Sequence, residues 1–346
     1  MKVNSLPNDL DKIVEQAFPA IQWRTFRTLI AVSGGPDSVA LLRLIVAAAD
    51  ETSKSNLIVA HINHGTRAQQ SDADADFVKE LAQQHHLEFC LDKIQLEPTT
   101  ETDEPNAATT HSHVRSEESL RNARYQRLIK MAGQLGCRYL VTGHHLDDQI
   151  ETVLFRIFRG TGITGLQGIP ERRVVNDALT IVRPLLSARS QDLKDYLSSI
   201  GQDFRIDPTN AESSYTRNFL RNEILPSLEQ RFGNVAAAVS RLSEHAKQTE
   251  AFLDLSVAPL LTAVTSRTDQ EVHFDRRQLI GQPDVLVQKL LMTVWSEQQW
   301  PLQGMTAAWW QRMTEAIKNK QTQSQTLNVP GPICFSIEKH QVYLSR

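Results

Sequence analysis

The sequence predicts an α/β fold, in which a doubly wound, mostly parallel sheet is followed by a smaller and mostly helical domain. Short apolar runs alternate with helical patterns in the first part of the chain, which is typical of parallel βαβ units with helices on both faces of a sheet. Beyond about residue 218, long helical patterns dominate. A length of 346 residues suits two or three domains of about 150 residues. We therefore expect one domain over residues 1–217 and a second over residues 218–346.

The first domain begins with an amphipathic helix over Leu10 to Phe18, which Pro19 ends. Strands are expected at four apolar runs: Thr28 to Ser33, Leu57 to Ile62, Glu88 to Ile94 and Arg138 to Gly143. Helices are expected over Ser38 to Ala49, Asp74 to Gln84, Ser119 to Leu135 and Asp147 to Phe158. Because open parallel sheets bind ligands at the carboxyl ends of their strands, the loops after Val32, Ile62 and Thr142 should share one ligand-binding edge.

Two segments of the first domain are expected to be mobile. Pro98 to His113 is polar and rich in Thr and Glu, and Gly160 to Pro170 contains four glycines. In the second domain, helices are expected over Asn234 to Leu255, Asp284 to Glu297 and Thr306 to Asn319. Two β-like runs near the C-terminus predict a terminal hairpin.

Composition limits the class of protein. No apolar run approaches the roughly 20 residues that span a bilayer, and the polar N-terminus is not a signal peptide, so we expect a cytoplasmic protein without membrane contact. Three widely spaced cysteines predict neither a disulfide framework nor a zinc site. The net charge of −3 excludes a generic nucleic-acid coat, but residues 156–189 hold six basic and two acidic residues. This local basic surface suits recognition of one structured RNA.

The segment SGGPDS, between the first strand and its helix, is a candidate phosphate-binding loop. Its glycines let successive backbone N–H groups point at an anion, and the start of the helix adds a positive dipole end. The loop lacks the Gly-Lys-Ser/Thr ending of a Walker loop and the GxGxxG pattern of dinucleotide-binding folds. The alternative is a glycine-rich turn with a helix cap. The candidate ATP-binding residues are Ser33, Gly34, Gly35, Pro36, Asp37 and Ser38.

A second cluster, GHHLDDQIET, follows the strand that ends at Thr142. Asp148 and Glu151 lie three residues apart on the first turns of a helix, so their carboxylates share a face. Such a pair can hold Mg²⁺ or an ammonium group, although acidic residues in a first helical turn also compensate the helix dipole. Two adjacent histidines and three carboxylates at one sheet edge favour a functional site.

Two further segments carry polar residues toward the same edge. His61 ends the second strand within HINHGTR. Arg121 and Arg124, in RNARY, share a helix face with spacing i, i+3, which suits either phosphate contact or salt bridges to Glu117 or Glu118. The sequence alone does not decide between these two roles.

Together these motifs resemble those of the tRNA(Ile)-lysidine synthetases, a family of N-type PP-loop ATP pyrophosphatases. The matching segments occur in the family's order across about residues 28–232. They are SGGPDS (33–38), HINHGTR (61–67), RNARY (121–125), GHHLDDQIET (143–152), FRGTGITGLQGI (158–169), RPLL (183–186), DPTN (207–210) and YTRNFLRNEILP (215–226). One departure is Asn63, which stands where the family pattern has an acidic residue.

The resemblance implies a carbon–nitrogen ligase that uses ATP and Mg²⁺. It would join L-lysine to C2 of the wobble cytidine in the CAU anticodon of a minor isoleucine tRNA. In the implied reaction the C2 oxygen attacks the α-phosphate of ATP and pyrophosphate leaves, after which the lysine ε-amine attacks C2 and AMP leaves. A tRNA contact is expected in the second domain as well. The oligomeric state is not fixed by the sequence, and a homodimer is compatible with it.

The residues and the resemblance together give a set of expected site residues, all numbered in this sequence. The catalytic set is Asp37, His144, Asp148, Glu151 and Arg217; ATP is bound by residues 33–38 and His61; lysine by Asp148 and Glu151; tRNA by Arg121, Arg124, Arg159 and Arg217; and metal by Asp37 and Asp148.

Three alternatives are weighed against this interpretation. A PP-loop tRNA thiolase activates the same kind of base but usually carries paired cysteines. A PP-loop ligase of the amidotransferase type carries a glutaminase nucleophile motif, which is absent from this sequence. A nucleotide-binding module without catalysis would not need the His, Asp and Glu cluster of the second motif.

Overall fold

The computed structural model describes residues 7–63, 68–93, 109–205 and 216–346, and side chains within 9–63, 72–93, 121–205 and 218–346. The chain forms two compact units, Met1–Ser243 and Glu244–Arg346. Each has its own apolar core. None of the described helices is long and apolar enough to cross a lipid bilayer.

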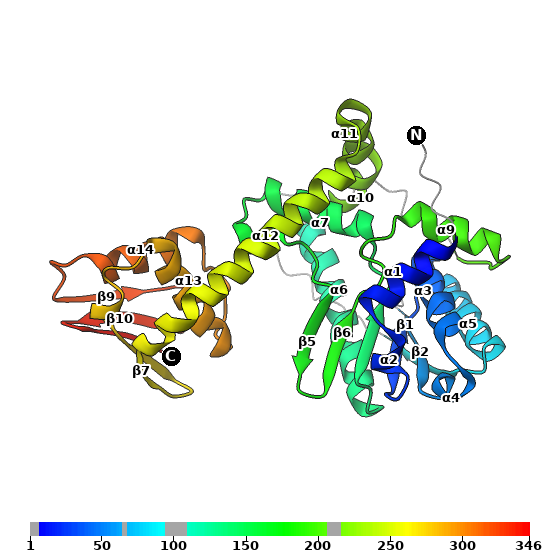
Figure 1. Cartoon of the computed structure of the whole chain (residues 1–346), viewed down its shortest axis with the longest axis horizontal. Helices are drawn as coiled ribbons and strands as arrows, with labels where there is room; N and C mark the ends of the chain where they lie inside the picture. The colour runs from blue at the N-terminus through cyan, green and yellow to red at the C-terminus, as the bar shows by residue number, and fades with distance from the viewer. Residues whose placement is uncertain (1–6, 64–67, 94–108, 206–215) are drawn as a thin grey trace. The chain divides into compact units, whose positions relative to one another are not determined.

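The first unit is built on a six-stranded sheet with the order β3-β2-β1-β4-β6-β5 (Figure 1). The strands are β1 (Thr28–Ala31), β2 (Leu57–Asn63), β3 (Glu88–Lys93), β4 (Tyr139–Thr142), β5 (Arg172–Asn176) and β6 (Leu179–Val182). All neighbours pair in parallel except β5 and β6, which pair antiparallel at the sheet edge. The mostly parallel sheet confirms the predicted fold class.

The helices of the first unit follow the predicted alternation. They are α1 (Pro7–Ala17), α2 (Ala20–Trp23), α3 (Pro36–Ala48), α4 (Glu51–Lys54), α5 (Ala68–Gln84), α6 (Thr109–Gln134), α7 (Leu146–Phe158), α8 (Ile163–Leu166), α9 (Ser190–Ser199), α10 (Thr216–Phe219), the π-helix η2 (Leu220–Ile224), α11 (Leu225–Phe232) and the first part of α12 (Val235–Val257).

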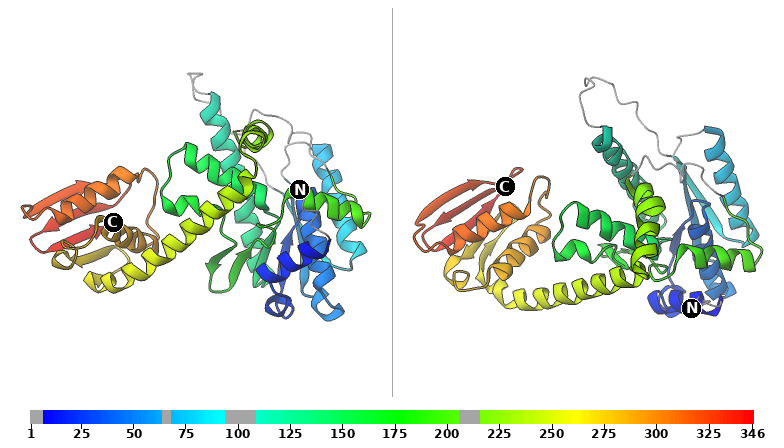
Figure 2. Two further views of the ribbon diagram at one scale, coloured as in Figure 1. Left: turned by 45° about the horizontal axis from the view of Figure 1, so that its top comes forward. Right: turned by 90° about the horizontal axis from the view of Figure 1, so that it is seen from above.

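Two apolar layers cover the two faces of the sheet. Ile30, Val59 and Val141 face a core that includes α1, α3, α5 and α9. Leu29 and Leu140, their neighbours in the chain, face α6 instead. Figure 2 shows α3 and α5, in blue and cyan, on the side of the sheet opposite to α6, in teal. Because successive side chains of a strand point to opposite faces, continuous apolar runs bury both faces.

Several element bounds differ from the sequence prediction. Helix α6 begins at Thr109, so the end of the predicted loop over Pro98 to His113 is helical, and residues 94–108 lie outside the described residues. The glycine-rich segment 160–170, predicted to be mobile, contains α8. Its carbonyls at Gly165 and Gly168 each accept a hydrogen bond of 2.9 Å from Arg156 Nη1.

The boundary between the units lies at Ser243, within α12, and not near residue 218. The reason is a small apolar cluster that joins α7 to the helices after it. Ile150 and Val153 of α7 pack there with Leu225 of α11 and with Val239 of α12. The segment around residue 220 therefore belongs to the first unit, where it contacts α7 through η2.

The second unit contains more β-structure than the sequence predicts. Its five-stranded antiparallel sheet has the order β7-β8-β11-β10-β9. Its elements are η3 (Ala258–Ala263), β7 (Val264–Arg267), β8 (Glu271–Asp275), η4 (Arg276–Gln278), α13 (Asp284–Glu297), α14 (Ala307–Lys318), β9 (Ser324–Asn328), β10 (Cys334–Glu338) and β11 (Gln341–Ser345). The predicted terminal hairpin corresponds to β10 and β11, which pair antiparallel.

Candidate active site at the carboxyl edge of the parallel sheet

The loop between β1 and α3 has the backbone of an anion-binding turn. Gly34 has a φ of 94°, a conformation that L side chains rarely adopt, and its carbonyl accepts a 2.9 Å hydrogen bond from the Arg205 N–H. Gly35 is the N-cap of α3 and Pro36 its first residue, where a missing N–H leaves nothing unsatisfied. The positive end of α3 therefore points out of the loop.

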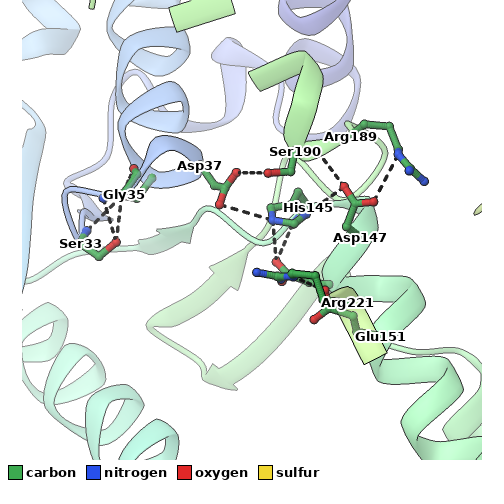
Figure 3. A network of polar contacts seen from close by, with 11 residues as sticks. Ser33, Gly35, Asp37, His145, Asp147, Glu151, Arg189, Ser190 and Arg221 are labelled. Carbon is green, nitrogen blue, oxygen red and sulfur yellow. Dashed lines mark hydrogen bonds and ion pairs between the residues drawn. The ribbon is translucent and has the colours of Figure 1, made fainter. Parts of the chain in front are cut away.

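Two serine hydroxyls hold this loop closed. Ser38 Oγ accepts a 3.1 Å hydrogen bond from the Ser33 N–H and donates to the Gly35 carbonyl at 2.9 Å. Ser33 Oγ lies 3.1 Å from Ser38 Oγ and accepts from the Gly35 N–H at 3.4 Å (Figure 3). Both serines are thus part of the loop's own hydrogen bonding as well as candidate contacts of an anion.

The end of β4 lies directly against this loop. A Cβ at Gly143 would come within 3.0 Å of the Asp37 carbonyl oxygen and 3.2 Å of Ser38 Cα, both of which are backbone atoms. Only glycine fits without movement of the backbone. This close approach brings the two main motifs, SGGPDS and GHHLDDQIET, side by side.

One cavity of about 530 Å³ joins the predicted motifs at this edge. Its lining combines loop residues, polar groups of α6 and α7, and one residue of η2. The polar and loop residues are Ser33, Gly35, Pro36, Asp37, Ser38, Arg121, Arg124, Tyr125, Thr142, Gly143, His144, His145, Asp148, Glu151, Thr152 and Arg221. The loops after β1 and β4 therefore share one site, as their positions after parallel strands predicted.

His145 occupies the centre of an acidic cluster (Figure 3). Its Nε2 lies 3.4 Å from Asp37 Oδ2 and 3.6 Å from Asp148 Oδ2, while its Nδ1 lies 3.7 Å from Asp147 Oδ2. The imidazole is almost fully buried. Asp37 also accepts a 3.0 Å hydrogen bond from Ser190 Oγ. Three carboxylates thus surround one imidazole.

The charges of this cluster shift the pKa values of its members. Burial alone would lower the pKa of His145, but the hydrogen bond to Asp37 and the charges of Asp148, Asp37 and Asp147 together raise it. For Asp37, burial alone would raise the pKa. Its hydrogen bonds to His145 and Ser190 and the charges of His145 and Arg221 outweigh burial and lower the pKa below its ordinary value. Both shifts favour the charged pair.

Arg221 spans the acidic pair that the sequence placed on one face of α7. Its Nη2 donates to Asp148 Oδ1 at 3.0 Å and its Nε donates to Glu151 Oε1. Burial raises the pKa of Glu151, and the arginine opposes that shift. Asp148 also accepts from the His145 N–H at 3.1 Å, so the helix-capping role and the ion-pair role coexist on this side chain.

Arg221 reaches this position from the π-helix η2. A π-helix has a wider turn than an α-helix, and such segments are frequent at functional sites. Arg217, the predicted catalytic and tRNA-binding residue, precedes it in α10, and its side chain lies outside the described residues. The described arginine that contacts the acidic pair is therefore one helical turn further along the chain.

His144 differs from its neighbour because arginines surround it. Its Nε2 lies 3.3 Å from Arg121 Nη2 and 3.4 Å from the Tyr125 hydroxyl, and its Nδ1 lies 3.0 Å from Thr142 Oγ1. Burial lowers the pKa of His144 well below its ordinary value, and the charges of Arg121, Arg183 and Arg124 lower it further. His144 is therefore neutral at physiological pH.

Other predicted site residues lie elsewhere. His61 is buried, and its Nδ1 contacts the Val32 carbonyl at 2.9 Å. It does not line the cavity. Arg159 is exposed at the end of α7, over the ring of Phe155. The end of HINHGTR (64–67) and the DPTN segment (207–210) lie outside the described residues.

Sequence reasoning missed three contributors to this site: His145, Arg221 and Tyr125. His145 was read as one of a histidine pair without a role of its own, and Arg221 stands in the motif that suggested Arg217. The spacing i, i+4 between these arginines was a usable signal, because it places both on one helix face.

Within the described part of the chain, no group of three or more His, Cys, Asp or Glu side chains is arranged to hold a metal ion.

Comparison with known proteins identifies relatives that cover most of the chain. Residues 7–228 match the model of the PP-loop domain family. The tRNA(Ile)-lysidine synthase of Rhodopirellula baltica is 32% identical over an alignment of length 367, gaps included, which covers 92% of this chain and 90% of that protein. The tRNA(Ile)-lysidine synthase of Chlorobaculum tepidum is 39% identical over 237 residues, covering 68% of this chain and 67% of that protein.

Among solved structures, the U34-tRNA thiolase NcsA from Methanococcus maripaludis, solved with its 4Fe–4S cluster, is similar in fold. The TM-score is 0.53 and the identity 17%, over 69% of this chain and 77% of that one. The three cysteines of the present chain are free thiols, and none of them lines the cavity. Burial raises the pKa of Cys137 to about 11, which makes it a poor nucleophile.

Proposed function

The chain belongs to the tRNA(Ile)-lysidine synthase family of PP-loop proteins, and from this premise we propose how its cavity performs an ATP-dependent ligation on tRNA. The substrates are ATP, free L-lysine and an isoleucine tRNA with a CAU anticodon. One observation carries the proposal: the phosphate loop and the acidic pair, of which Glu151 is buried and Asp148 half-buried, open into the same cavity.

The loop of residues 33–38 binds the pyrophosphate part of ATP. Backbone N–H groups at the start of α3 and the hydroxyls of Ser33 and Ser38 supply donors without a lysine of the Walker type. Such a site stabilises the charge that develops on pyrophosphate when the wobble base attacks the α-phosphate.

Asp37 and Asp148 fit the needs of a Mg²⁺ ion that accompanies ATP. Mg²⁺ is usually held by one or two carboxylates together with water and phosphate oxygens. Here Asp37 Oδ2 and Asp148 Oδ2 lie 3.4 and 3.6 Å from His145 Nε2, so a Mg²⁺ ion held by these two carboxylates would compete with the imidazole for their oxygens. When bound, the ion neutralises phosphate charge.

Asp148 and Glu151 form the lysine pocket, with Arg221 as the third member. Free lysine brings an α-ammonium and an α-carboxylate as well as its ε-amine. In the structure the arginine pairs with both acids. When lysine enters, its α-ammonium takes the carboxylates and its α-carboxylate takes the guanidinium, so no buried charge is left unpaired. The ε-amine then remains available for attack on the activated base.

The direct test is incubation with α-labelled ATP, lysine and a CAU-anticodon isoleucine tRNA, followed by nucleoside analysis. We expect lysidine in the tRNA and labelled AMP that forms only when both other substrates are present. Sulfur incorporation or AMP formation without lysine would contradict the proposal.

Glu151→Gln tests the lysine pocket. Removal of one partner from a buried ion pair costs about 3–5 kcal/mol, or roughly 10²- to 10³-fold or more in affinity, so the KM for lysine should rise by that order. The KM for ATP and the Mg²⁺ dependence should change little. Steady-state kinetics with each substrate varied provides the measurement.

The matched control is Glu88→Gln. Glu88 forms a similar pair with Arg27, 2.7 Å apart, but on the exposed start of β3 and outside the cavity. An unchanged lysine requirement in Glu151→Gln would reduce the acidic pair to a structural feature. A raised Mg²⁺ requirement in its place would assign Glu151 to the metal.

A further inference from the structure

Two neighbouring aspartates at the start of α7 have different surroundings. Asp148 lines the cavity, where it pairs with Arg221. Asp147 is not among the described residues that line the cavity, and its carboxylate faces the segment that begins α9 (Figure 3). Its Oδ2 accepts a 2.8 Å hydrogen bond from the Ser190 N–H, and its Oδ1 lies 3.3 Å from Arg189 Nε. Both carboxylate oxygens of Asp147 therefore anchor the start of α9.

The start of α9 is fixed by packing as well as by this carboxylate. Leu193 and Leu197 of α9 are fully buried in the same core as the apolar side of α3. The Leu146 N–H, at the first residue of α7, donates to the Ala188 carbonyl at 2.8 Å. Ser190 therefore lies in a segment that is held against both α3 and α7.

The hydroxyl of Ser190 reaches the phosphate loop. Ser190 Oγ donates to Asp37 Oδ1 at 3.0 Å. The other carboxylate oxygen of Asp37, Oδ2, lies 3.4 Å from His145 Nε2, and Asp148 Oδ2 lies 3.6 Å from the same nitrogen. Because Ser190 occupies one oxygen of Asp37, it determines which oxygen turns toward His145 and Asp148, both of which line the cavity.

We propose that Ser190 is a positioning residue for Asp37, and that Asp147 and Arg189 act through Ser190 from outside the cavity. The inference rests on the proposed function for the role of Asp37 toward ATP and Mg²⁺. A carboxylate that rotates freely loses that freedom when it binds a ligand, whereas a carboxylate that is held beforehand does not. The hydrogen bond from Ser190 therefore supports binding without contact between Ser190 and the ligand.

The same support extends to α11, the helix that follows η2 and its Arg221. Arg189 Nη1 and Nη2 lie 3.3 and 3.2 Å from Glu229 Oε1 of α11. Arg189 thus joins Glu229 to Asp147. The side chains of Arg189 and Glu229 are each 34% exposed, and exposed ion pairs contribute little to stability. This pair is therefore the outer and weaker part of the support.

Ser190→Ala tests the proposal through ATP binding, measured by calorimetry at a series of Mg²⁺ concentrations without lysine or tRNA. The Mg²⁺ concentration that gives half-maximal ATP binding should rise roughly 10-fold, because loss of a group that orients a metal-binding carboxylate typically costs that much or more. ATP binding in the presence of a chelator should stay as in the wild type. Ser190→Thr keeps the hydroxyl and should stay within a few-fold of the wild type.

Ser199→Ala is the matched control. Ser199 lies on the same helix, and its hydroxyl donates to the Tyr196 carbonyl at 2.7 Å on the exposed surface. If Ser190→Ala needs no more Mg²⁺ than Ser199→Ala does, the inference is overturned, even where the Tm of Ser190→Ala is lower. Equal losses in Ser190→Ala and Ser190→Thr would also overturn it, since the hydroxyl would not be the group that acts.

Failure of the proposed function gives a different result. ATP binding by the wild type that needs no Mg²⁺ would contradict the metal role of Asp37, and this inference with it. A wild-type protein that forms lysidine and binds ATP in a Mg²⁺-dependent manner, with Ser190→Ala unchanged in both respects, would overturn this inference alone.

A double-mutant cycle separates two possible effects of Asp147. It holds Ser190, but its charge also acts on His145, whose Nδ1 lies 3.7 Å from Asp147 Oδ2. Asp147→Asn alone should raise the Mg²⁺ requirement several-fold, and Glu229→Gln should raise it less. In the Ser190→Ala background Asp147→Asn should add little, because residues that act through one contact are not additive. Fully additive effects would show that Asp147 acts on His145 directly and would overturn its role through Ser190.

Discussion

At the scale of single residues, two adjacent histidines in one motif have opposite electrostatic roles. His145 faces three carboxylates and its pKa is raised, whereas His144 faces arginines and its pKa is lowered. The sequence around the two histidines does not predict these opposite pKa shifts. The charges that cause them belong to other segments or to the helix turn that follows. The pair therefore divides the cavity into an acidic and a basic region.

The first prediction concerns the titration of His145. Its folded pKa is raised above 6.5, so its stabilisation is present below that pH and is lost as the pH rises through the raised value. The pKa of Asp37 is lowered below 3.8, so its stabilisation is present above that pH and is lost as the pH falls through the lowered value. Between the lowered pKa of Asp37 and the raised pKa of His145, both groups are charged and the ion pair is complete. Asp37→Asn should therefore lower the pKa of His145, measured by NMR of the imidazole.

Asp177→Asn provides the control for this titration, because Asp177 is an exposed acid in the turn between β5 and β6. Identical His145 titrations in wild type, Asp37→Asn and Asp177→Asn would mean that Asp37 does not hold the imidazolium.

The acidic pair of the site could be predicted from the sequence, but its arginine could not. Asp148 and Glu151 are three residues apart, and helical periodicity alone places them on one face. Arg221 is 70 residues from Glu151 in the chain, and its contact depends on the packing of η2 against α7. Local spacing shows which side chains share an element face, whereas the partner of that face is fixed by tertiary structure.

At the scale of elements, the four expected strands correspond to β1, β2, β3 and β4, whereas β6 was not expected although all four of its residues are buried. Strands β1, β2 and β4 lie inside the sheet, and their apolar runs mark them. Strand β5 lies at the edge, is mostly exposed and begins with two arginines, so it shows no apolar pattern. In the mostly helical second unit, the strands outside the terminal hairpin were not expected for a related reason: β7 and β9 are short strands with largely exposed residues.

The arginines of the basic segment, residues 156–189, fall into two groups according to the contacts that they make. Arg156 donates to carbonyls of the α8 segment, and Arg172 contacts Gln22 and lies over the ring of Phe18. These two arginines therefore hold the fold together. Arg159 and Arg173 are exposed, and no hydrogen bond or ion pair to a carboxylate is recorded for them among the described side chains.

The second prediction follows for tRNA binding. Replacement of Arg159 and Arg173 by Ser should weaken tRNA affinity and reduce its salt dependence by about one unit per lost phosphate contact. ATP binding without tRNA should stay as in the wild type. Filter binding at several salt concentrations measures both quantities, with Lys79→Ser on the exposed face of α5 as control. Equal salt slopes in all three proteins would place the RNA on another surface.

At the scale of the whole molecule, the chain contains two separate cores. The residues that line the cavity all belong to the first unit, Met1–Ser243. The core of the second unit is built from its own sheet and helices, with Phe335 and Trp295 fully buried. Lys289 of α13 binds Glu250 and Asp254 of α12, at 2.7 and 2.8 Å, so the later part of α12 is tied to this second core.

The last prediction is that the two units respond separately to ligand and to mutation. A ligand that binds only the folded first unit stabilises it by about 2.7 kcal/mol at 100 times its Kd, which corresponds to a shift of roughly 5–10 °C for a unit of this size. Calorimetry should show two unfolding transitions, of which ATP raises only one. Phe335→Ala, which costs about 3–5 kcal/mol in a buried core, should lower or abolish the other and leave the ATP-dependent shift intact. Leu41→Ala in the first core should have the reverse effect. If ATP and Phe335→Ala instead move one common transition, the two cores unfold as a single cooperative body, and the continuous helix α12 would be the element that couples them.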